Sequence, residues 1–391
     1  LYRRRAQLLQ HRLFPELRRR LRPDKNAISR IYGCYVNSSR EIISYLDESL
    51  GTMPQDESEK YLSLLKKGLS GGLGRNLIDI VFSTAQVMDS DEHRLLTALR
   101  DSELKDAEAR NRFYQTVIDS LEMEDCNYLI LLACDVYDVP HRSKDDELQP
   151  DASDEVFRYI LCSICPVKDG KPELGFFSGD NEFHSCMASQ IVSQPELGFL
   201  FPAFDDRTAN IYNALLYTRT PDQVHHEFIA AVFHTEPPLS AAEQREGFQA
   251  ALSGALDDSF NMEVVQAVHE QLLDKIEQHK ESKDPEPLTV SVQEVAAILK
   301  GCGVADTQVA AFEAQCGEQF GDGAVLNPEN IIDSKHFEVK TADASVAIDP
   351  KHSYIVETRI IDGRKYLLIP ADEGVEVNGM AVGIAAADRR A

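Results

Sequence analysis

The stretch Asn127-Tyr-Leu-Ile-Leu-Leu-Ala-Cys-Asp-Val-Tyr137 contains the strongest apolar run of the chain and predicts a buried β-strand. A second apolar stretch, Glu155–Pro166, predicts another strand that ends at a proline, with Leu174–Phe177 as its expected partner. Upstream, the β-branched and aromatic residues of Ile28–Val36 predict a strand. The turn residues after it lead into Glu41–Leu46, so we expect these two segments to form a hairpin.

Helical patterns surround these strands. Residues 54–69 open with Pro54 and acidic residues, as the first turn of a helix prefers. Further strands are expected at 77–82 and 199–204. Further helices are expected at 90–100, 105–121, 207–217, 221–233, 240–256 and 261–280. Strands concentrated early and helices later favour a multi-domain α+β fold, with mixed or antiparallel sheets and flanking helices.

The C-terminal part of the chain combines two helices with a β-rich segment. The helices are expected at 292–300 and 306–319, and Ser291 with Glu294 forms a capping box for the first of them. Asp362-Gly363 is a hairpin signal. Strands are expected at 336–340, 345–348, 354–361, 365–369 and 375–377. This order predicts a helix pair followed by a β-meander.

A chain of 391 residues is too long for one ordinary hydrophobic core, so we expect several domains. Polar residues 138–154 form one candidate boundary, and the charged, proline-containing segment 279–287 forms the clearest linker. The expected parts are a basic N-terminal helical arm at 1–23, an α+β domain at 24–145, a middle α+β domain at 150–280 that ends in helices, and a C-terminal domain at 288–391.

The chain is strongly acidic, with 65 Asp and Glu residues against 40 Lys and Arg residues and a formal net charge of −25. Such a surface repels phosphate backbones, so nucleic-acid binding over the whole body is disfavoured. The sequence contains no apolar run of the roughly 18 residues that a transmembrane helix needs. Its eight cysteines are too irregularly spaced for a disulfide scaffold, and a reducing cytoplasm is the expected location.

The N-terminal arm has the opposite charge to the rest of the chain. Residues 1–25 carry nine basic residues against Glu16 and Asp24, with leucines at helical spacing. One hypothesis is that the arm contacts RNA or the ribosome, or an anionic membrane surface. The alternatives are a helix docked on the protein's own acidic body, or residues that are not native to the protein.

Phe201-Pro-Ala-Phe-Asp-Asp-Arg207 contains the best candidate for a catalytic site. Asp205 and Asp206 follow a predicted strand, and paired carboxylates there could bind a metal or act as acid and base. Arg207 could bind an anionic substrate. The structural alternative is that one aspartate caps the helix expected to begin near Arg207.

Cys162-Ser-Ile-Cys165 and His184-Ser-Cys186 together offer four candidate zinc ligands. Against this interpretation, Cys162 and Cys165 belong to a predicted strand, where residues three apart face opposite ways. Buried thiols and an exposed histidine are the alternative. The sequence identifies no other cofactor.

Two further motifs favour structural roles. The glycine-rich segment Ser70–Arg75 lies between a predicted helix and a predicted strand, whereas phosphate-binding loops run from a strand into a helix. The helix pair at 292–319 resembles a helix-turn-helix, but its second helix has neither lysine nor arginine. Sequence-specific DNA binding is therefore not expected.

Several long motifs, in order, resemble a family of uncharacterised bacterial proteins known only as a domain of unknown function, number 4317. The resemblance covers about residues 16 to 382. It implies a bacterial, cytoplasmic protein, and it brings no known activity, cofactor or partner. The stretches that carry it are Leu21–Val36, Leu69–Leu77, Asp151–Val156, Leu197–Arg207, Lys283–Leu288 and Val356–Arg364.

Three hypotheses about function follow, and whether the chain is an enzyme stays open. The first is a non-enzymatic cytoplasmic protein that acts through macromolecular contacts, because no catalytic motif outweighs its structural alternative. The second is an enzyme that acts on a phosphorylated or other anionic small molecule at Asp205, Asp206 and Arg207. The third is an RNA- or ribosome-associated factor that uses the basic arm.

Overall fold

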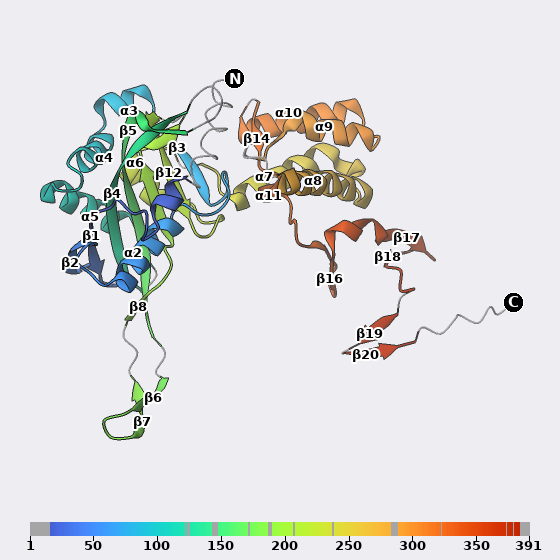
Figure 1. Cartoon of the computed structure of the whole chain (residues 1–391). Helices are drawn as coiled ribbons and strands as arrows, with labels where there is room; N and C mark the ends of the chain where they lie inside the picture. The colour runs from blue at the N-terminus through green and yellow to red at the C-terminus, as the bar shows by residue number, and fades with distance from the viewer. Residues whose placement is uncertain are drawn as a thin grey trace. The chain divides into compact units, whose positions relative to one another are not determined.

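The computed structural model describes residues 16–121, 123, 126–142, 148–170, 173–186, 190–205, 208–236, 238–282, 288–321, 323–372, 374–377 and 379–383. The chain divides into two compact units (Figure 1). Unit 1 comprises Leu1–Gln244 and Asp284–Pro287, and unit 2 comprises Arg245–Lys283 and Leu288–Ala391. Both units combine helices with antiparallel strand pairs, so the predicted α+β class is confirmed.

Unit 1 is built on one large sheet in which neighbouring strands are antiparallel, in the order β2-β1-β4-β5-β9-β12-β3. A short strand, β8, also pairs with β5. The strands are β1 (Arg30–Val36), β2 (Ile42–Ser49), β3 (Leu77–Val81), β4 (Asn127–Arg142), β5 (Leu148–Asp169), β8 (Gln190–Val192), β9 (Leu197–Phe201) and β12 (Asn213–Thr218). The predicted strand at 127–137 and the predicted hairpin at 28–46 are confirmed.

Helices cover both faces of this sheet, which explains its continuous apolar strands. In β5, Ile160 and Ile164 belong to the core on one face, while Tyr159 and Leu161 belong to the core on the other. The first core includes residues of α4 (Asp91–Asp101), α5 (Ala107–Ser120) and α6 (His226–Phe233), and the short helix α3 (Thr84–Asp89) precedes α4. The second includes residues of α2 (Gln55–Lys67) and of the helical residues 16–20 (Figure 1).

The boundary expected at 138–154 lies within the pairing of β4 with β5. These two strands pair from Asn127 with Val167 as far as Arg142 with Leu148. Residues 138–142 and 148–154 belong to these two strands, and residues 143–147 lie outside the described residues. The expected 24–145 and 150–280 parts therefore share one sheet, and the division between units falls in α7 (Ala241–Leu256).

The helix predicted at 207–217 is wrong, because β11 (Thr208–Asn210) and β12 occupy this segment. Alanine and leucine at 214–216 favour a helix locally. The segment is nevertheless buried between β9 and β3, and this tertiary context decides its structure. The helix predicted at 221–233 begins only at His226, after a left-handed His225 (φ 54°).

The sequence predicted that Leu174–Phe177 pairs with the strand at 155–166, and this prediction is wrong. The segment belongs to β6 (Glu173–Phe177), which forms a separate hairpin with β7 (Glu182–Cys186). The strand predicted at 199–204 is divided between β9 and β10 (Ala203–Asp205), and β10 pairs with β11. Unit 1 therefore has two small hairpins beside its main sheet.

Unit 2 has a helical core. Its helices are α7, α8 (Met262–Ser282), α9 (Val292–Gly301), α10 (Asp306–Phe320) and α11 (Pro328–Ile331), with the 3₁₀ turn η1 (Asp257–Ser259) between α7 and α8. A short pair, β13 (Val290–Ser291) and β14 (Val325–Leu326), links the segments that flank α9 and α10. The capping box is confirmed, because the Ser291 hydroxyl accepts from the Glu294 N–H and the Glu294 carboxylate accepts from the Ser291 N–H.

The β-rich C-terminal segment forms three separate hairpins and not the expected meander. They are β15 (Phe337–Lys340) with β16 (Ser345–Ile348), β17 (Glu357–Ile361) with β18 (Arg364–Leu368), and β19 (Val375–Val377) with β20 (Met380–Val382). Asp362 (φ 51°) and Gly363 (φ 80°) make the predicted turn between β17 and β18, with the positive φ values that such turns require. The 3₁₀ segment η2 (Pro350–Ile355) replaces the start of the strand predicted at 354–361.

Candidate functional site

The predicted catalytic segment lies at the β10–β11 hairpin. Asp205 is the last residue of β10 and pairs with Thr208. Asp206 and Arg207 lie outside the described residues. No helix begins near Arg207 in the described structure, since residues 208–210 are a strand, so the helix-capping interpretation is wrong. Catalysis at these three residues remains a prediction.

Two of the four candidate zinc ligands, Cys162 and Cys165, are on β5 of the large sheet. The other two, His184 and Cys186, are on β7 of the β6–β7 hairpin. Cys162 faces the core that contains α5, and Cys165 faces the core that contains α2, so the two thiols lie on opposite faces of β5. Burial raises the pKa of Cys165 to about 12, which keeps it a thiol. His184 is on β7 and contacts Asp180, with 2.7 Å between Nε2 and Oδ2. The side chain of Cys186 lies outside the described residues.

This geometry prevents Cys162 and Cys165 from binding one ion together. Zinc ligands must converge on one point, and two side chains on opposite faces of a buried strand cannot do so. Among the described residues, no group of three or more His, Cys, Asp or Glu side chains is arranged to hold a metal.

The glycine-rich loop uses its backbone amides internally. The N–H groups of Arg75, Asn76 and Leu77 all donate to the Gly72 carbonyl, at 3.3, 3.0 and 3.0 Å. The Asn76 side chain donates to the carbonyls of Thr218 and Arg219. The loop therefore holds the start of β3 against the end of β12 through hydrogen bonds. This agrees with the structural role that the sequence predicted for it.

The described end of the basic arm is docked on unit 1. Leu17 and Leu21 are buried in the core on the α2 side of the sheet. The Arg20 guanidinium donates two hydrogen bonds to the Asp135 carboxylate, at 2.7 and 2.8 Å. Its carbon Cζ also lies 4.5 Å from the centre of the Tyr137 ring. For residues 16–21, the docked-helix interpretation agrees with the structure.

Asp135 is a buried carboxylate with two strong partners. It lies on β4 and is 2% exposed, and the hydroxyl of the fully buried Tyr159 also donates to it at 2.7 Å. Burial alone lowers the pKa of Arg20, but the hydrogen bonds and negative charge of Asp135 outweigh this and raise it. Arg20 and Asp135 use their charges and hydrogen bonds on each other, so we assign this buried pair a structural role.

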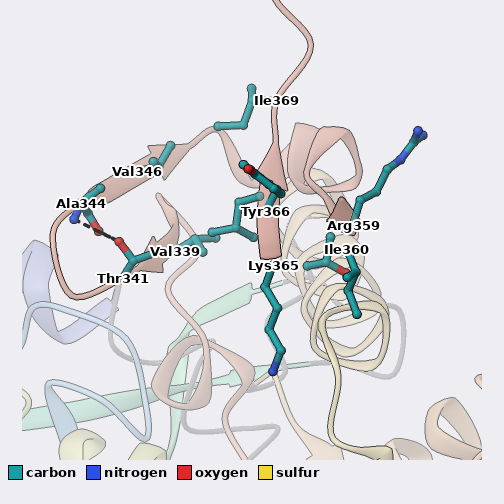
Figure 2. A pocket seen from close by; sticks show the side chains of 11 residues that line it. Val339, Thr341, Ala344, Val346, Arg359, Ile360, Lys365, Tyr366 and Ile369 are labelled. Carbon is teal, nitrogen blue, oxygen red and sulfur yellow. Dashed lines mark hydrogen bonds between the residues drawn. The ribbon is translucent and has the colours of Figure 1, made fainter. Parts of the chain in front are cut away.

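Unit 2 has an open cavity of about 820 Å³ between the β15–β16 and β17–β18 hairpins. Figure 2 shows Val339 and Val346 on one hairpin, Tyr366 on the other and Ile369 just after it, with Lys365 extending away from Tyr366. The lining contains no histidine, cysteine, serine or carboxylate, and its polar side chains are Thr341, Thr358, Arg359, Lys365 and Tyr366.

The β6–β7 hairpin carries an exposed apolar face that we call the hairpin surface, formed by Leu174, Phe176 and Phe183. Their exposed fractions are 73%, 56% and 64%. Phe176 pairs with Phe183 across the two strands, and their ring centres are 5.2 Å apart. The sequence predicted the strand but not this surface. The available signal was the alternation of Leu174 and Phe176 in a segment with no amphipathic helix nearby to cover it.

Two buried histidines, one in each unit, contact backbone carbonyls. His93 Nε2 lies 2.8 Å from the Ile211 carbonyl, and its ring packs edge-on against Phe82 and Phe201. His269 Nε2 lies 2.9 Å from the Asp333 carbonyl. Among the described residues, neither histidine is hydrogen-bonded to a serine, threonine or cysteine side chain, which a nucleophile–base pair requires.

These features define an α+β protein with a helix-covered antiparallel sheet and a second unit of helices and hairpins. Residues 11–380 match the family model described as "Domain of unknown function (DUF4317)", and the chain belongs to this family. The resemblance seen in the sequence is thereby confirmed. No curated protein matches the chain. Within the described residues, none of the helices has both the length and the apolar character needed to cross a bilayer.

Proposed function

We propose that this chain is a non-enzymatic protein of the bacterial cytoplasm that acts through macromolecular contacts. The observation that carries this proposal is the hairpin surface. An isolated two-stranded hairpin is at best marginally stable in water. A hairpin that holds Leu174, Phe176 and Phe183 largely exposed gains stability if a partner covers them.

The chemistry of the hairpin favours a protein partner over nucleic acid or an anionic membrane. Asp180 and Glu182 stand on the same hairpin, and their side chains are 52% and 71% exposed. Their negative charge repels phosphate groups. An apolar groove on another protein is the surface that complements these exposed side chains.

Two further observations support the proposal. Arg18 and Arg20 of the basic arm bind Leu69 and Asp135 of the protein itself, so they are not available to RNA. Burial raises the pKa of Cys34 and Cys134 to about 12, and they are free thiols, as expected in a reducing compartment.

A pull-down from bacterial lysate, with the full chain as bait, tests the proposal. The test variant is Phe176→Ser/Phe183→Ser. The matched control is Ile43→Ser/Tyr45→Ser, which removes two side chains of similar exposure (57% and 61%) from β2. We expect a protein that is retained by the wild type and the control and is lost with the hairpin variant.

Parallel samples treated with nuclease separate this result from RNA association. A partner that disappears with nuclease in all three samples would support the RNA hypothesis instead. Equal capture by the hairpin variant and the control, or no capture by any form, would contradict a role for the hairpin surface.

A further inference from the structure

Unit 2 contains a second cavity, distinct from the one between its hairpins. It lies between α7, α8 and residues 331–338 and has a volume of about 790 Å³. We call it the α7–α8 cavity. Its size is within the range of small-molecule sites, which also combine apolar walls with a few polar groups.

The walls of the α7–α8 cavity are mainly apolar and come from well-packed residues of the unit 2 core. Helix α7 supplies two of them, α8 supplies two, and the chain at α11 and β15 supplies the others. They are Phe248, Leu252, Val264, Val268, Ile331 and Phe337. These apolar residues belong to the unit 2 core, while the segment between α11 and β15 closes one side of the cavity.

Arg245 is the cationic group of the cavity. Its Nε donates to the Asn330 carbonyl at 3.2 Å, which fixes the half-buried side chain at the wall. Within the described residues, no Asp or Glu oxygen forms an ion pair with Arg245. The guanidinium therefore keeps hydrogen-bond donors that suit a carboxylate.

Carboxylates near the cavity are engaged elsewhere, with one exception. Asp333 accepts from the N–H groups of Lys335 and His336, at 2.8 and 3.2 Å. Glu338 pairs with Lys340 at 2.9 Å. Glu246 is exposed at the rim. Three carboxylates therefore line the cavity together with Arg245, but among the described residues none of them forms an ion pair with its guanidinium.

His269 adds an acceptor to the same wall. Its Nε2 faces the Asp333 carbonyl, which can only accept, so Nε2 carries the proton. Nδ1 is then an acceptor, and it is buried without a hydrogen-bond partner. Burial lowers the pKa of His269, so the ring is neutral and does not compete with Arg245 for an anion.

We propose that the α7–α8 cavity binds a small molecule with an apolar body and one carboxylate, which Arg245 binds while the walls enclose the apolar part. This goes beyond the proposed function, because it concerns a small ligand in unit 2 and not the hairpin surface of unit 1. The two proposals can fail separately.

The chain has no tryptophan, so one introduced tryptophan is a specific fluorescent reporter. Phe260 lines the cavity and is 40% exposed, and Phe260→Trp in the full chain places the reporter at the rim. The probes are decanoate and the uncharged decanol. We expect decanoate to change the fluorescence saturably and to bind about tenfold or more tightly than decanol, because a charged hydrogen-bonded group adds that much.

Two substitutions at Arg245 test whether this residue binds the carboxylate of the ligand. In the Phe260→Trp background, Arg245→Ala should weaken decanoate about tenfold or more and leave decanol unchanged, while Arg245→Lys should keep part of the preference. Arg359→Ala, at the other cavity, is the matched control and should behave as the parent. Circular dichroism confirms that each variant is folded.

Three results would overturn the proposal. These are no saturable change with either probe, equal binding of decanoate and decanol, or full decanoate affinity in folded Arg245→Ala. If both probes respond as expected while the lysate experiment finds no partner, the cavity stands and only the hairpin proposal fails.

Discussion

Strands β9 and β17 are both five residues long, but their surroundings differ completely. Every residue of β9 (Leu-Gly-Phe-Leu-Phe) is buried, and every residue of β17 (Glu-Thr-Arg-Ile-Ile) is exposed. By composition β17 is the better strand, because it has three β-branched residues and no glycine. The difference lies in their neighbours: β9 pairs with β5 and β12 between two helical layers, whereas β17 pairs only with β18 among the described strands. Position in the sheet, and not strand propensity, determines where the stability of this chain resides.

The largest expected effect in the buried sheet comes from its charge pair. Arg20→Ala leaves Asp135 buried without its cation, and we expect a loss of about 3–5 kcal/mol of unfolding free energy. Arg19→Ala is the matched control, since this neighbour in the same helical segment is exposed. Urea denaturation followed by circular dichroism measures both. Similar midpoints for the two variants would show that the docked arm does not stabilise the sheet.

This pair also shows where prediction from sequence ends. The basic residues and leucine spacing of the arm were visible, but Arg20 and Asp135 are 115 positions apart. Nothing local connects them. The same holds for the segment 207–217, whose residues favour a helix until β9 and β3 enclose them.

Predictions that rest on local chemistry agreed better with the structure. The capping box at Ser291, the Asp362-Gly363 turn and the opposite orientation of Cys162 and Cys165 all depend on short-range geometry. The candidate site could not be predicted in the same way. The alternation of Leu174 and Phe176 indicates a strand with an apolar face, but whether other side chains cover that face depends on the tertiary fold.

The second-largest loss of unfolding free energy is expected at Gly198, where the backbones of β9 and β5 lie close together. A Cβ atom added at Gly198 would lie 2.5 Å from the Cys162 carbonyl oxygen of β5, and backbone cannot move aside easily. Gly198→Ala should therefore cost about 2–3 kcal/mol. Gly179→Ala is the control, because nothing lies within 4 Å of that position. A wild-type melting temperature for Gly198→Ala would contradict the tight packing of β9 against β5.

The stability of the helical core of unit 2 is expected to depend on pH. Burial lowers the pKa of His269 below its ordinary value of 6.5. The unfolded chain then binds a proton at a higher pH than the folded chain, so stability falls as the pH drops below 6.5. Thermal melts of wild type and His269→Gln between pH 7.5 and pH 5 should show a smaller decline for the variant. An identical decline in the two proteins would rule out His269 as its source.

The smallest effect is expected in β17. Ile360 is 72% exposed, so Ile360→Thr should change the unfolding free energy by no more than about 0.5 kcal/mol. Hydrogen exchange at Arg359–Ile361 and urea denaturation both report on this strand. A loss above 1 kcal/mol that grows with protein concentration would indicate that a second chain covers the hairpin.

The pairing of β3 with β12 has a consequence for synthesis of the chain. Val81 pairs with Asn213, so β3 leaves the ribosome about 130 residues before its partner. At ordinary elongation rates this interval is on the order of ten seconds. During it, Leu77, Ile78 and Ile80, which are buried in the finished sheet, have no partner strand. Nascent chains at this stage are candidates for chaperone binding, and any fragment designed to fold alone must extend at least through Thr218.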